Sequence, residues 1–235
     1  MIVLSKFIVL VIFLVICYLI AAPLFLNRYH RLDLLQVIVS CTLGSMIAAL
    51  VFVLGLVSGI TNQFVIVSVL LGVAIYNVNR LGLRIVPKLN DFSRINGLLY
   101  WTTIVPFCGA VLVAQFKMGY GEFPHTFFGL DTPLKLADAH QLTVSGEYPP
   151  RSLMIEGWMP AYHYGAQSIV ALMSRVSRLP VHLIMFCVVA PLLILACHSV
   201  CLQILQKNFG SSQKALIGFV LFLPLFLLGP YIWDI

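Results

Sequence analysis

Charge is what this 235-residue chain has least of: only 9% of its residues are Asp, Glu, Lys or Arg, whereas 61% are hydrophobic. Its mean hydropathy is +1.02. A soluble globule of this size could not withdraw so much apolar surface from water. The composition therefore predicts an all-α, polytopic integral membrane protein.

The signatures of several other protein classes are also missing. The 14 Lys and Arg residues stand singly or in pairs between apolar runs, with no basic stripe interleaved with aromatic residues, so we expect no nucleic-acid partner. The six cysteines lie within apolar segments and form no CxxC pair, which argues against a disulfide framework or a zinc site. The sequence contains no Walker motif, Gly-x-Ser-x-Gly or His-Glu-x-x-His.

Long apolar runs are abundant instead. A spanning helix needs roughly 20 apolar residues, and on that count the chain holds about seven candidates, of which the third and fifth are short. In chain order they are 2–26, 34–60, 64–78, 95–116, 164–176, 181–205 and 215–233. The first run has no small-residue cleavage pattern at its end, so we expect it to be retained as a span.

The expected organisation is three segments: transmembrane helices over 1–115, an extracytoplasmic loop over 116–163, and further transmembrane helices over 164–235. Placing 27–33, 79–94 and 174–179 in the cytoplasm collects eight of the 14 basic residues there and leaves Lys207 outside. This orientation fits a bacterial inner membrane. Because the chain stops directly after its last apolar run, its end resembles an interruption, which would make it the N-terminal part of a longer protein; a short natural terminus is the alternative.

The long polar interval 116–165 holds most of the groups able to transfer protons or bind a metal. Five of the eight acidic residues and three of the six histidines fall inside it: Glu122, Asp131, Asp138, Glu147, Glu156, His125, His140 and His163. If the protein catalyses a reaction, we expect the reaction to take place here.

One short helix is predicted inside this interval, from Pro133 to about residue 145. Asp131-Thr132-Pro133 is a helix-start signal, and Gly146 suits the other end. On that helix Asp131, Lys135 and Asp138 share a face, because they are spaced three to four residues apart. His140 is turned away from this face.

Five short motifs carry a resemblance to a known family. They are Gly-Leu-Asp-Thr-Pro at 129–133, Ala-Asp-Ala-His at 137–140, Gly-Glu-Tyr-Pro-Pro at 146–150, Tyr-His-Tyr-Gly at 162–165 and Leu-Pro at 179–180. Together they resemble the first large outer loop of the GT-C-fold membrane glycosyltransferases, most closely bacterial members in which an Asp, a Gly-x-x-Pro-Pro turn and a Tyr-His-Tyr element recur. The likeness covers about a fifth of the chain.

The resemblance implies transfer of a sugar from a polyprenyl-phosphate donor at the outer membrane face. In the family an Asp at the start of this loop acts as general base on the acceptor hydroxyl, and by position that residue is Asp131 here. Some members use a divalent metal ion beside an Asp-Glu pair. In this chain Thr132 follows Asp131, a departure that puts metal assistance in question.

Each candidate also has a structural interpretation. Asp131 is the candidate base, yet it could simply cap the helix, worth about 1 kcal/mol. Asp138 could assist catalysis or pair with Lys135 on a solvated face. His163 could contact a donor phosphate or belong to an interfacial aromatic cluster. The candidate substrate-binding residues are His140, Glu147, Arg151, Tyr162 and Tyr164.

An alternative function stays open. The chain could be a non-catalytic membrane subunit, or a degenerate paralogue, whose outer loop binds a partner membrane protein. A transporter fits less well, because transporters place ionisable groups near the bilayer midplane, whereas here they gather in a loop.

Overall fold

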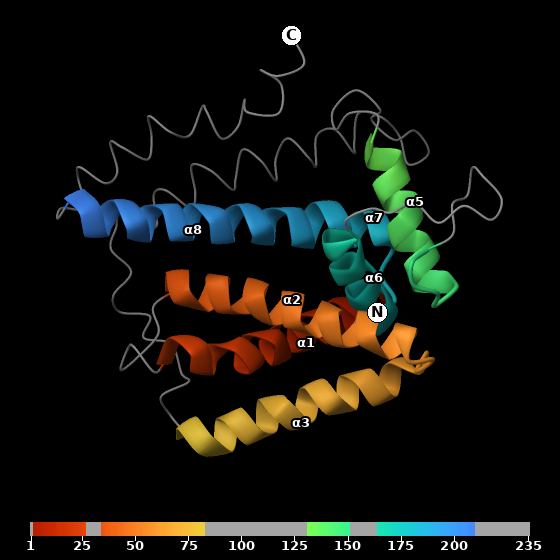
Figure 1. Ribbon diagram of the computed structural model, residues 1–235, viewed down its shortest axis with the longest axis horizontal. Coiled ribbons are helices and arrows are strands. Elements are labelled where there is room, and N and C mark those ends of the chain that lie inside the picture. Colours follow the sequence, from red (N-terminus) through yellow and green to blue (C-terminus); the bar gives the residue numbers. More distant parts are fainter. Residues whose placement is uncertain (1, 27–33, 83–130, 151–163, 210–235) are drawn as a thin grey trace, which may run out of the picture.

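The computed structural model describes residues 2–26, 34–82, 131–150 and 164–209, and every regular element in this part of the chain is a helix (Figure 1). The all-α class predicted from composition is confirmed for these residues. The elements are α1 (Ile2–Leu26), α2 (Leu34–Val57), α3 (Gln63–Leu81), α5 (Asp131–Val144), α6 (Gly165–Ser177), α7 (Val181–Ile184), the π-helical turn η3 (Met185–Val189) and α8 (Ala190–Phe209).

Four helical stretches are long and apolar enough to cross a membrane: Leu4–Leu26, Gln36–Val57, Gln63–Leu81 and Val181–Cys201. Their mean hydropathies run from 1.8 to 3.0. They correspond to the first, second, third and sixth predicted spans, so the chain is a membrane protein. The predicted spans at 95–116 and 215–233 lie outside the described residues.

The first two spans pack closely because small residues face each other. A Cβ added to Gly44 of α2 would overlap the backbone carbonyl of Cys17 in α1, so only glycine permits this approach. Ala21, Ala48 and Ala49 nearby are also buried. Small residues are typical of helix contacts in membranes, where close backbone packing replaces the hydrophobic effect between helices.

The third span is fixed to the first by a polar contact that a proline makes necessary. Pro23 lies inside α1 and has no N–H to donate to the carbonyl of Leu19, four residues earlier. Asn77 of α3 donates its Nδ2 to that oxygen at 3.0 Å, with a longer contact of 3.4 Å to the Ile20 oxygen. A backbone carbonyl that proline leaves open is thus satisfied by a neighbouring helix, as the bilayer core requires.

A second proline shapes the last described span, where α7, η3 and α8 follow one another without a break. Pro191 lies near the middle of the span that begins at Val181, at the start of α8, and cannot donate a helical hydrogen bond. Just before it the helix widens to π geometry, and the Ala190 N–H reaches back to the oxygen of Met185. This wide turn lets the helix continue past the proline.

The predicted fifth span, 164–176, is not a span in the structure. α6 has 13 residues, which makes it about 20 Å long, whereas the hydrocarbon core is about 30 Å thick. Figure 1 shows α6 lying across the direction of the long helices, beside α5. Its residues from Gln167 to Ser174 are all buried, so its apolar length reflects burial against other helices rather than exposure to lipid.

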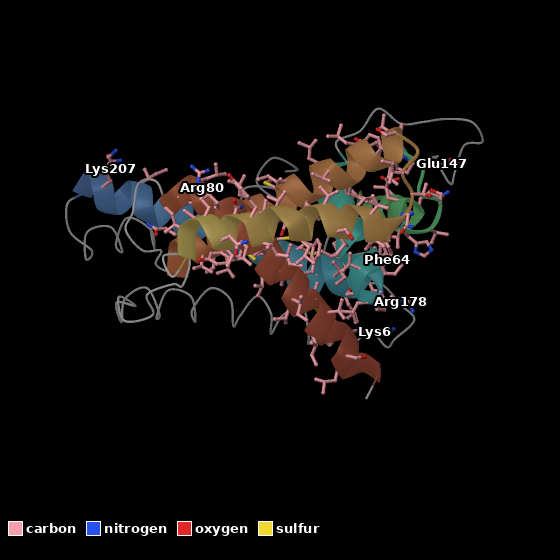
Figure 2. All side chains as sticks on the ribbon, turned by 90° about the horizontal axis from the view of Figure 1, so that it is seen from below. Lys6, Phe64, Arg80, Glu147, Arg178 and Lys207 are labelled. Carbon is pink, nitrogen blue, oxygen red and sulfur yellow. The ribbon has the colours of Figure 1, made fainter. Side chains whose placement is uncertain are left out.

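The predicted position of the 174–179 turn is also wrong. Arg175 of α6 donates from Nε to the Thr143 oxygen of α5 at 2.7 Å, and its Nη1 lies 3.5 Å from the Thr61 oxygen in the α2–α3 turn. The turn therefore shares one end of the bundle with α5, instead of facing the opposite side. Figure 2 places Arg178 and Glu147 toward this end, and Arg80 and Lys207 toward the other.

Candidate functional site

The helix predicted from the polar interval exists and begins two residues earlier than expected. α5 runs from Asp131 to Val144, with Pro133 in its first turn. The Ser145 N–H donates to the Gln141 oxygen, and Gly146 follows with a φ of 69°, a conformation that favours glycine at a helix end. Ala139 and Leu142 are fully buried, and α5 packs against α6 and α7. The chain after α5 is thereby directed toward the start of α6.

Two tyrosines from the family-like motifs meet at this point. The rings of Tyr148 and Tyr164 pack edge to face, with centroids 5.9 Å apart and an interplanar angle of 78°. Tyr148 is half-buried and Tyr164 is buried. An edge-to-face pair of this kind stabilises by about 0.5–1.5 kcal/mol beyond the burial of its area. The contact joins the segment that follows α5 to the residue that precedes α6.

Asp138 belongs to the same neighbourhood. Its side chain is half-buried, and this burial raises the pKa of the Asp138 carboxyl. Burial also raises the pKa of Tyr164, with smaller contributions from the charge of Asp138 and from Tyr148. The Tyr164 hydroxyl therefore stays protonated at neutral pH, within electrostatic reach of a carboxylate. A carboxylate beside a phenol can accept a proton or orient a hydroxyl group.

An apolar cavity of about 380 Å³ opens beside the two tyrosines. Its walls come from α2, from the first turns of α6 and from Leu193 of α8, and they include Met46, Leu50 and Ile169. The Ser168 side chain also lines it, with a buried Oγ that has no hydrogen-bond partner in the described structure. A volume of this size with apolar walls and a few polar groups is typical of a small-molecule or lipid-chain site.

The structure brings together only some of the predicted site residues. Tyr164 packs against Tyr148, and the charge of Asp138 acts on Tyr164, whereas His140 is exposed two residues along α5 and lines a different hollow with Arg175 and Arg178. Glu147 is exposed just beyond α5. Arg151, Tyr162, His163 and the side chain of Asp131 lie outside the described part of the chain, so their roles stay predictions.

The metal prediction also stays untested. Among the residues that the structure describes, no three His, Cys, Asp or Glu side chains are grouped closely enough to hold an ion.

Reasoning from sequence does not single out two residues of this region, Tyr148 and Ser168. The Gly-Glu-Tyr-Pro-Pro motif at 146–150 is the available signal for Tyr148. Nothing in the local pattern distinguishes Ser168, because its position beside the cavity depends on helices distant in sequence.

Comparison with models of protein families, with curated proteins and with solved structures found no match to this chain.

Proposed function

We propose that the chain is an integral membrane glycosyltransferase, or the N-terminal part of one, that transfers a sugar from a polyprenyl-phosphate donor at the outer face of a bacterial inner membrane. The observation that carries this proposal is the meeting of the family-like motifs beside the apolar cavity. The segments at 146–150 and 162–165 contribute Tyr148 and Tyr164, which pack together in the cavity wall next to the membrane spans, and the segment at 137–140 contributes Asp138, whose charge acts on Tyr164.

In the proposed reaction the cavity receives part of the polyprenyl chain, which leaves the sugar phosphate at the polar rim. Asp131, at the start of α5, removes the proton from the acceptor hydroxyl. The acceptor oxygen then forms a bond to the anomeric carbon while the bond from that carbon to the phosphate oxygen breaks. The lipid phosphate departs with the electron pair of the broken bond. Asp138 and Tyr164 orient the sugar hydroxyls or the acceptor, and His163 assists at the phosphate.

The proposed orientation rests on the family resemblance of the loop. Arg80 and Lys207 lie toward the end of the bundle opposite α5, whereas Arg175 and Arg178 lie at the α5 end, so basic residues stand at both ends. We propose that the end that carries α5 faces outward, where lipid-linked sugars are consumed in the family that this loop resembles.

The test is donor consumption by the full chain in nanodiscs, with a panel of polyprenyl-phosphate hexoses that carry tritium in the sugar. We expect Asp131→Asn to abolish release of sugar from the lipid while leaving membrane insertion unchanged. The matched control is Lys207→Gln, which neutralises an exposed charge at the opposite end of the bundle and should retain activity.

Retained activity in Asp131→Asn would remove Asp131 from the mechanism. If neutralising all the loop acids changes nothing in the cell and the chain co-purifies with a membrane protein, the alternative of a non-catalytic subunit is supported instead.

A further inference from the structure

A second hollow, of about 450 Å³, lies beside α5 and is lined by neither of the two tyrosines. It is lined by His140 and Thr143 of α5, by Arg175 and Arg178 at the end of α6, and by the first residues of two spans, Gln63 and Val181. We call it the basic hollow. Among the described residues that line it, none is a carboxylate. Its chemistry therefore favours an anion.

Arg175 is held rigidly at the base of this hollow. Its guanidinium donates to the oxygens of Thr143 and Thr61, and its Cζ lies 5.4 Å from the centroid of the Phe52 ring. These two hydrogen bonds use two of the five N–H groups that an arginine carries, so donors remain for a ligand. Burial lowers the pKa of Arg175, but a guanidinium keeps its charge at neutral pH.

Arg178 adds a second cation in an unusual backbone conformation. It closes α6 with a φ of 57° and ψ of 26°, where glycine is the usual residue. A non-glycine residue in this region costs roughly 1–2 kcal/mol, and such strain is a reason to look for a function. The side chain is exposed, so burial does not explain the choice of arginine.

The position of the basic hollow relative to the membrane identifies the class of anion. Gln63 and Val181 are the first residues of two membrane spans, so the hollow lies at the boundary where lipid headgroups are found. Arginine pairs well with phosphate oxygens because its planar fork offers parallel donors. A zwitterionic headgroup would also need an acid for its ammonium group, and the described lining supplies none.

We propose that the basic hollow binds the phosphate of an anionic glycerophospholipid from the surrounding bilayer, with Arg175 and Arg178 as its ligands and His140 beside them. A lipid bound here contacts α5, the α6–α7 turn and the start of α3 together. It would fix the helix that carries Asp131 to the membrane surface. The proposal does not depend on the glycosyltransferase assignment.

The test is native mass spectrometry of the full chain in detergent, with phosphatidylglycerol and phosphatidylcholine offered at equal concentration. We expect preferential retention of phosphatidylglycerol, and a loss of at least roughly tenfold in its affinity for Arg178→Asn. Asparagine tolerates a positive φ, so this variant should fold. Arg178→Lys, which keeps a charge, should lose less, and Lys207→Asn, at the opposite end, should lose nothing.

Equal binding of phosphatidylcholine, or unchanged affinity in Arg178→Asn, would overturn the proposal. Displacement of the lipid by millimolar inorganic phosphate would also overturn it, because the hollow would then be a site for a soluble anion. His140→Gln provides a second variant on an exposed position that does not threaten folding. It should weaken phosphatidylglycerol binding, and unchanged affinity would remove His140 from the site.

Discussion

Arg175→Met should make local opening of α5 more frequent without unfolding the spans. The hydrogen bond from Nε to the Thr143 oxygen is short, at 2.7 Å, and its donor is charged. Such a bond contributes about 2 kcal/mol, and its loss leaves a carbonyl in the last turn of α5 unpaired. Methionine keeps much of the apolar length of the side chain. A loss of about 2 kcal/mol corresponds to roughly a 30-fold rise in the opening equilibrium of α5.

Hydrogen exchange of backbone amides, followed by mass spectrometry in detergent, measures that equilibrium for each helix separately. We expect peptides from α5 to exchange roughly 30-fold faster in Arg175→Met, with α3 unchanged. Lys207→Met removes a charge from an exposed side chain at the opposite end of the bundle and should leave α5 as in the unmodified protein. Unchanged exchange in α5, or equal acceleration in all helices, would refute the role given to this hydrogen bond.

Two further predictions concern a buried carbonyl and a half-buried acid. Asn77→Ala should lower stability by about 0.6–1.7 kcal/mol, and Pro23→Ala should offset most of this loss, because alanine restores an N–H for the Leu19 oxygen. Thermal unfolding of the two single variants and of the double variant forms a double-mutant cycle. If the stability changes of the single variants simply add in the double variant, the explanation is contradicted. Burial raises the pKa of Asp138, so its contribution to stability is present below its unfolded pKa and is lost as pH rises through the folded value. Asp138→Asn should therefore gain stability over the unmodified protein between pH 4 and pH 7, and a melting-temperature difference that stays constant over that range would be evidence against it.

Local sequence signals predicted the parts of the candidate site that depend on neighbouring residues. Pro133 and Gly146 mark the ends of α5, and the observed helix begins and ends close to them. The meeting of Tyr148 with Tyr164 could not be predicted in this way, since it depends on how α5 packs against α6. The same is true of Ser168, whose hydroxyl lines the apolar cavity only because α2 and α8 lie opposite.

The number of spans likewise depends partly on the sequence alone and partly on how the helices pack. Composition and run length alone predicted a membrane protein that is helical throughout the described residues, and four apolar runs became candidate spans, because long apolar helices leave few alternatives in a bilayer. The run at 164–176 was shorter than a span needs, but its length did not say where the helix lies. The tertiary structure decided this, through the burial of the residues from Gln167 to Ser174 and the contacts of Arg175 with α5 and with the α2–α3 turn. A charged side chain selects its carbonyl partners by position in space, which periodicity along the chain does not encode.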